Sequence, residues 1–128
     1  MSIHPTLRYD DANAAIAFLT GALGFVASHV DTADDGSVAH AELAFGDGVL
    51  MLGSRATPPG PFNTGRAVTY LVLDGADAVD AHHEKAVAAG AEILHGPVDQ
   101  PYGSREYAAV DPEGNVWSIG TYRPTVPS

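Results

Sequence analysis

The chain contains no cysteine, which excludes disulfide bonds, thiolate metal sites and thiol nucleophiles. It also lacks an apolar run long enough to span a membrane, and its first residues lack the basic and apolar regions of a secretory signal peptide. Basic residues are scarce: six Lys and Arg stand against sixteen Asp and Glu, giving a formal net charge of −10. Such a charge disfavours nucleic acid and anionic membranes as partners, and it favours a cationic ligand over an anionic one. We therefore expect a cytoplasmic protein that binds neither nucleic acid nor membrane.

The 128 residues, 45% of them hydrophobic, suffice for one domain with its own core. In the first half, alternation at residues 6–9 predicts a strand, and Asp10 or Asp11 supplies an N-cap for an alanine-rich helix at 12–23 that Gly24 ends. Three further strands are expected at 25–30, 37–45 and 49–52.

The proline-rich segment 54–65 excludes a helix or a central strand and is expected to be a linker. After it the same order of elements begins again, with a strand at 68–73 and a helix that is capped within 74–77 and runs to about Ala89. Three more strands are expected at 91–95, 105–110 and 115–122.

This internal repeat predicts an α+β fold of two βαβββ modules in a single domain over residues 1–128. Module 1 covers about 1–53, and module 2 covers about 66–124. Each module has one helix and can cover only one face of its sheet, so pairing the modules favours a half-open, barrel-like cup between the sheets. A concave cup of this kind is the default site for a ligand.

The last two strands are joined by Asp111-Pro-Glu-Gly-Asn, which matches the residue preferences of a type I turn and is expected to be structural. Arg105 is expected to pair with a nearby carboxylate such as Asp111 or Glu106. Strand alternation should direct Trp117 and Ile119 under the helices. The residues expected to face the cup from this strand are Val116, Ser118 and Tyr122.

Four stretches of the chain resemble the vicinal oxygen chelate superfamily, which includes glyoxalase I, extradiol dioxygenases, fosfomycin resistance enzymes and bleomycin resistance proteins. They are residues 4–11, 21–25, 89–91 and 100–117. The last of them looks most like the bleomycin-resistance and PhnB-like branches. The resemblance implies the cup-shaped fold, but the superfamily hosts isomerases, dioxygenases, thiol transferases and pure binding proteins on that scaffold.

Metal-dependent members of the superfamily carry four ligands on the first and last strands of the two modules. In this chain the corresponding positions fall on His4, Met51, Val68 and Ser118. Only His4 is a strong ligand, because a thioether, an isopropyl group and a neutral hydroxyl do not replace carboxylate and imidazole. Shifting the alignment by one residue supplies no better donor, so we expect neither a metal nor another cofactor.

The leading hypothesis is a metal-independent protein that sequesters a hydrophobic or aromatic small molecule, such as an antibiotic or another natural product. Aromatic and thioether groups suit a flat ligand of this kind. The residues expected to line or close the cup are His4, Thr6, Met51, Phe62, Val68, Tyr70, Tyr102, Ser118 and Tyr122. In the resembled branches two chains complete each other's cups, which implies a homodimer.

Two alternatives remain open. One is an enzyme, such as a lyase, isomerase or dioxygenase, that uses His4 with a cup carboxylate, or a metal held by His4, His40, Glu42 and Glu106. A strongly perturbed carboxylate pKa inside the cup would favour the enzyme, whereas an all-neutral aromatic cup would favour binding. The second alternative is an interaction protein whose cup is already filled.

The run from Asp80 to Glu84, which includes His82 and His83, is expected to lie on a solvated helix face.

Overall fold

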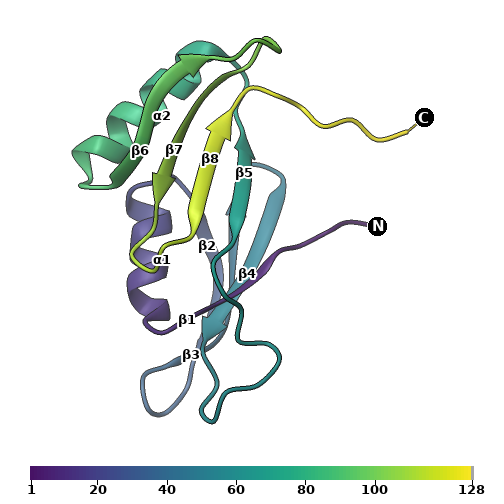
Figure 1. The fold of residues 1–128 in the computed structure, drawn as a ribbon. Helices are drawn as coiled ribbons and strands as arrows, with labels where there is room; N and C mark the ends of the chain where they lie inside the picture. The colour runs from purple at the N-terminus through teal and green to yellow at the C-terminus, as the bar shows by residue number, and fades with distance from the viewer. Residues whose placement is uncertain (128) are drawn as a thin grey trace.

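The computed structural model describes residues 1–127 and places them in two four-stranded sheets, each accompanied by one helix (Figure 1). The elements of the first half are β1 (Thr6–Tyr9), α1 (Ala12–Gly21), β2 (Val26–Thr32), β3 (Val38–Phe45) and β4 (Gly48–Ser54). Those of the second half are β5 (Val68–Val72), α2 (Ala76–Ala88), β6 (Glu92–Asp99), β7 (Arg105–Val110) and β8 (Val116–Gly120). The predicted α+β fold of two βαβββ modules is confirmed.

The two sheets have the same topology, which is the structural counterpart of the repeat in the sequence. Their strand orders are β1-β4-β3-β2 and β5-β8-β7-β6. In each sheet the first strand runs parallel to the last, and the other neighbours are antiparallel. The sheets do not close into a barrel, so each keeps one face that its own helix does not cover. In residues 1–127 neither helix has the length and hydropathy needed to cross a membrane.

The ends of the two helices follow from short-range signals. Asp11 is the N-cap of α1, where its Oδ1 accepts a hydrogen bond from the Ala14 amide at 3.0 Å. Gly24 follows this helix with a φ of 79°, a conformation that favours glycine. The N-cap of α2 is Gly75, which offers no side-chain acceptor. The cap therefore lies within the predicted range 74–77, and the Asp74 carboxylate pairs with Arg123.

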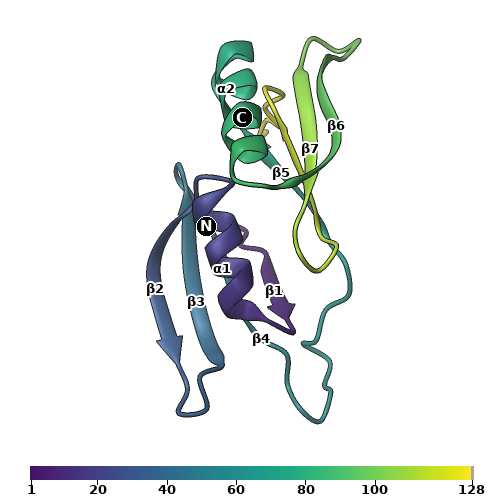
Figure 2. The same cartoon turned by 90° about the vertical axis from the view of Figure 1, so that its left-hand side faces the viewer.

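The modules meet through residues on the helix-covered faces of their sheets. The Tyr9 hydroxyl on β1 donates to Asp111 Oδ2 in the β7–β8 turn at 2.7 Å. The rings of Phe25 and Trp117 form a T-shaped pair with centroids 5.6 Å apart. Trp117 and Ile119 are fully buried in the shared core, as strand alternation predicted. Figure 2 shows the two helices one above the other, with the sheets beside them.

His82 also belongs to this joint between the modules, so its expected place on a solvated helix face is wrong. Its Nε2 lies 2.7 Å from the Leu23 carbonyl oxygen and must donate to it, which leaves Nδ1 to accept from the Tyr107 hydroxyl at 2.6 Å. Burial lowers the pKa of this imidazole, so the ring is held neutral. The prediction of a solvated face failed because the periodicity of α2 does not show that the first module packs against His82.

Arg105 pairs with carboxylates as predicted, but neither Asp111 nor Glu106 is among them. Its guanidinium binds Asp80 on α2 at 2.7 Å and Asp99 at the end of β6 at 3.1 Å. Arg105 and Glu106 are neighbours on a strand, and their side chains point to opposite faces of the sheet. Asp111, the other predicted partner, is 4% exposed within its turn, where Oδ1 accepts from the Glu113 and Asn115 amides at 3.0 Å. The structural role predicted for this turn is confirmed.

Candidate functional site

The uncovered face of the second sheet carries a shallow depression of about 510 Å³. Register explains how its lining residues meet: Tyr70 on β5 lies beside Ser118 on β8, and Glu106 on β7 lies opposite Gly120. The loop before β7 and the segment after β8 add two more aromatic side chains. The lining residues are Tyr70, Tyr102, Glu106, Ser118 and Tyr122.

A carboxylate with three hydroxyl donors forms the floor of the depression. Glu106 is only 7% exposed. Its Oε2 accepts from Tyr70 at 2.7 Å and from Ser104 at 2.9 Å, and its Oε1 accepts from Tyr102 at 2.6 Å. Burial alone would raise the pKa of Glu106, but the hydrogen bonds from Tyr102, Tyr70 and Ser104 outweigh burial and hold it below its ordinary value. The carboxylate is therefore ionised at neutral pH.

A glycine makes room for this network. A Cβ atom built on Gly120 would collide with the Tyr70 hydroxyl oxygen and with Glu106 Cγ. Gly120 has no positive φ, so the glycine is required by close approach rather than by its backbone conformation. Because position 120 on β8 has no side chain, the Glu106 carboxylate and the Tyr70 hydroxyl can pack directly against the backbone of β8.

Two tyrosine rings rise beside the carboxylate. Tyr102 and Tyr122 form a T-shaped pair with centroids 6.0 Å apart, and their side chains are 61% and 51% exposed. The hydrogen bond to Glu106 raises the pKa of Tyr102 to about 12, so its hydroxyl keeps its proton at neutral pH. The walls are aromatic and open to solvent, whereas the floor is ionised.

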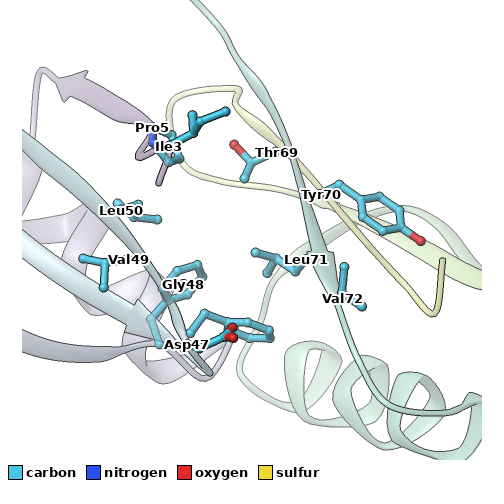
Figure 3. A pocket seen from close by; sticks show the side chains of 12 residues that line it. Ile3, Pro5, Asp47, Gly48, Val49, Leu50, Thr69, Tyr70, Leu71 and Val72 are labelled. Atoms are coloured by element: carbon cyan, nitrogen blue, oxygen red, sulfur yellow. The ribbon is translucent and has the colours of Figure 1, made fainter. Parts of the chain in front are cut away.

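A second cavity, of about 250 Å³, lies between the modules, where the β3–β4 hairpin and the N-terminal residues face β5. Figure 3 shows Leu50 and Leu71 projecting into this space, while the Tyr70 ring points away from it. Tyr70 lines both the depression and the inter-module cavity, and its hydroxyl group donates to Glu106 in the depression. The inter-module cavity is lined mainly by apolar side chains.

The positions expected to hold a metal in related proteins do not fit one here. His4 Nδ1 lies 2.8 Å from the Val49 carbonyl oxygen and donates to it, and its Nε2 is 2.7 Å from Ser2 Oγ. The other three positions carry Met51, Val68 and Ser118, which offer no strong donor for a hard cation. Among residues 1–127 there is no group of three or more His, Asp or Glu side chains placed to hold a metal ion.

The structure brings together part of the predicted ligand-binding set. Tyr70, Tyr102, Ser118 and Tyr122 share the depression on the second sheet. Thr6 and Met51 are partners in the β1–β4 ladder, on the uncovered face of the first sheet. Val68 and Phe62 are highly exposed, at 74% and 73%. His4 lies at the N-terminal approach to β1, hydrogen-bonded to the Val49 carbonyl.

Glu106 lines the depression but is absent from the predicted ligand-binding set. From the sequence, Glu106 is a candidate partner for Arg105 and, in the enzyme alternative, a candidate metal ligand. Strand alternation contained the missing signal: Tyr107 is an apolar core position, so Glu106 faces the same way as Tyr70 and Ser118. In that alternative set, His40 and Glu42 pair with each other at 2.9 Å on the first sheet, whereas Glu106 lies on the second.

Two βαβββ modules with an open sheet face on each define the fold class. The model of the Glyoxalase/Bleomycin resistance protein/Dioxygenase superfamily matches residues 2–119. The chain belongs to this superfamily, and the resemblance seen in the sequence is confirmed.

Relatives and solved structures agree with this assignment. The Mycobacterium tuberculosis protein Rv0887c is 31% identical, over 93% of this chain and 73% of its own length. The crystal structure of TioX from Micromonospora sp. ML1 superposes with a TM-score of 0.75 and 26% identity, over 99% of this chain and all of that one. A glyoxalase-related enzyme from Fulvimarina pelagi superposes with a TM-score of 0.74 at 18% identity, over 95% of this chain and 88% of that chain, which shows the shared fold alone.

Proposed function

We propose that the protein binds a small hydrophobic or aromatic molecule, such as an antibiotic or another natural product, and sequesters it without a metal and without turnover. The observation that carries this proposal is the group of Tyr70, Tyr102 and Tyr122 around an open depression on a sheet face that no helix covers. Exposed tyrosine rings offer large apolar area at a low cost in conformational entropy. Burial of an aromatic ligand against them would supply the affinity.

The depression is not the all-neutral cup expected of a pure binding protein, because it contains the ionised Glu106, but the state of this carboxylate argues against a role as general base. A general base works best at neutral pH when its pKa lies near the operating pH. The pKa of Glu106 is shifted the other way, below its ordinary value, because its hydrogen bonds to three hydroxyls outweigh the effect of burial. Its oxygens are also engaged by hydroxyl groups, and the hydrogen-bond partners of His4 include no carboxylate. This network suits the recognition of charge better than proton abstraction.

The ligand-binding form is proposed to be a homodimer. The modules of one chain join through their helix-covered faces, so the uncovered faces of the two sheets point outward. These faces carry exposed apolar side chains, among them Val26 at 66% and Val68 at 74%. A second copy would cover these faces and deepen the depression into a cup. Sedimentation equilibrium is expected to give a dimer, and a monomer at every protein concentration, with and without ligand, would contradict this part.

A thermal-shift screen of aromatic metabolites and antibiotics tests the binding proposal. A ligand at about a hundred times its Kd adds on the order of 2.7 kcal/mol of stability, enough for a clear shift in Tm. Each hit would then be incubated with the protein and recovered for mass analysis. Recovery of the unchanged compound at a stoichiometry of one per chain supports sequestration, whereas conversion of the compound supports the enzyme alternative.

Site variants connect any hit to the depression. Tyr122→Ala removes one aromatic wall and is expected to weaken binding about tenfold, or about 1.4 kcal/mol. Val87→Ala is the matched control, because Val87 is a half-exposed apolar residue on α2, outside the depression. Equal loss of affinity in both variants would show that the ligand binds elsewhere.

A further inference from the structure

We infer that the depression selects a ligand that carries a protonated amine, with Glu106 as the counter-charge for that amine. The inference rests on the proposed binding function and names the chemical class of its ligand. Three observations carry it: a buried carboxylate without a basic partner, three hydroxyl groups that donate their protons to that carboxylate, and aromatic walls beside it.

The charge of Glu106 is not neutralised by a cation of its own chain. Within residues 1–127, none of the ion pairs includes this carboxylate. The adjacent Arg105 is directed to Asp80 and Asp99 on the other side of the sheet. His95 acts on Glu106 only through its electric field, and its Nδ1 is bonded to the Gly96 carbonyl. The hydroxyl donors stabilise the charge of Glu106 but do not cancel it, so a bound cation would be attracted to an ionised group that is only 7% exposed.

The direction of the hydrogen bonds defines what the floor can accept. Tyr70 and Tyr102 donate their hydroxyl protons to Glu106, as does Ser104. These three hydroxyl groups therefore have no proton left for a ligand, and the Tyr70 and Ser104 oxygens also accept from the backbone amides of Tyr122 and Thr121. A ligand group that meets Glu106 itself must be a donor. An ammonium group has donors only, whereas a carboxylate or phosphate would be repelled by the ionised Glu106.

The tyrosine walls of the depression and the net charge of the protein also favour an ammonium group. A cation held within about 6 Å of a tyrosine ring is attracted by the negative face of its π system. Tyr102 and Tyr122 stand beside the carboxylate as a T-shaped pair. The net charge of −10 adds a long-range field that draws cations toward the protein. An amine on an aromatic or apolar body satisfies both the walls and the floor.

A comparison with Asp111 separates this site from a purely structural carboxylate. Asp111 is also buried, but it lies inside a turn and accepts from backbone amides and the Trp117 indole. The partners of Glu106 are hydroxyl groups, and two of them, on Tyr70 and Tyr102, belong to residues that line the depression. The Asp111 carboxylate stabilises its own turn, whereas the Glu106 carboxylate forms the floor of an open site.

The test uses three probes of similar shape and different charge: 2-phenylethylamine, 2-phenylethanol and 3-phenylpropionate. An alkylamine resembles the lysine side chain and is protonated at pH 7. Each probe is titrated into the full-length protein at constant ionic strength, and binding is followed by the NMR shifts of the ring protons of Tyr70, Tyr102 and Tyr122. We expect the amine to bind at least about tenfold more tightly than the alcohol, and the propionate to bind most weakly.

Two charge-removing variants give the control. Glu106→Gln keeps the shape of the side chain but removes its charge, so the affinities for amine and alcohol should become equal while that for the alcohol is little changed. Glu42→Gln removes a carboxylate that pairs with His40 on the first sheet, outside the depression, and should leave the tenfold preference intact. Raising the salt concentration should weaken binding of the amine and not of the alcohol.

The outcomes separate this inference from the function on which it rests. If the alcohol binds but the amine binds no more tightly, the depression is a neutral aromatic site or a second copy supplies the counter-charge, and the inference is overturned while the proposed function stands. A preference for the amine that persists in Glu106→Gln also overturns it. If none of the three probes shifts the tyrosine resonances, both proposals fail. If Glu106→Gln does not fold, the affinities of the wild-type protein for the amine, the alcohol and the propionate are enough to test the inference.

Discussion

The joint between the two modules makes the stability of the whole chain sensitive to one hydroxyl group. Tyr9→Phe removes the hydroxyl that donates to Asp111 Oδ2 at 2.7 Å and leaves the fully buried ring in place. A hydrogen bond to a charged acceptor contributes about 1.5–3 kcal/mol. The carboxylate keeps its donors from the Asn115 amide and the Trp117 indole, so it is not left unpaired and the loss should lie near the lower limit. We expect the free energy of unfolding to fall by about 2 kcal/mol.

Urea denaturation at pH 7 measures this loss through the fluorescence of Trp117, the only tryptophan in the chain. The indole lies at the joint, in contact with Phe25, so its signal reports separation of the modules. Tyr122→Phe is the matched control, because Tyr122 is half exposed on the other face of the second sheet and should change the free energy by less than about 0.5 kcal/mol. Equal losses in the two variants would refute a stabilising role for the Tyr9–Asp111 bond.

Two further perturbations probe the joint and the floor of the depression. Burial lowers the pKa of His82, so the unfolded chain takes up the proton first; the stabilisation from the neutral ring is present above about pH 6.5 and is lost as the pH falls. Urea denaturation across this range should show a loss that is smaller in His82→Gln, and an equal loss in both proteins would contradict the assignment. Gly120→Ala places a Cβ against Tyr70 and Glu106 and should lower the free energy of unfolding by about 1–3 kcal/mol. Gly21→Ala, with no atom within 4 Å of the new Cβ, is the control in thermal denaturation and should be neutral or stabilising.

Local signals were enough to predict the order of the elements. Asp11 caps the first helix as expected, whereas the helix ends at Gly21, two residues before its predicted end, and the left-handed Gly24 follows it. The alternation around Trp117 was read with the correct face, because the turn that precedes it has a strong residue signature. The clearest error in length is β6, which extends to Asp99 beyond its predicted end at His95, since an edge strand with register shifts shows little alternation.

The partners of charged side chains were not predictable in the same way. Arg105 pairs with residues on α2 and β6, and only the packing of that helix and strand around β7 brings the three side chains together. The burial of His82 depends on the other module, which its own helix pattern cannot reveal. The depression was predicted in part: its tyrosines were named, but Glu106 was not assigned to it, because the sequence shows neither its hydroxyl partners nor the space left by Gly120.

Successive residues of the β7–β8 hairpin face alternately the core and the open face of the second sheet. Tyr107, Trp117 and Ile119 point to the core and are fully buried, whereas Glu106 and Ser118 point to the open face. Successive side chains on a strand face opposite sides, so a change at a pocket position need not disturb the core position beside it. The apolar core and the buried Asp111 turn fix the two strands, and on this rigid scaffold the open face is free to vary in charge. Such a face can therefore lack the metal-ligand residues of related proteins while the fold stays intact, and under the proposed function the same face recognises its ligand by charge and stacking.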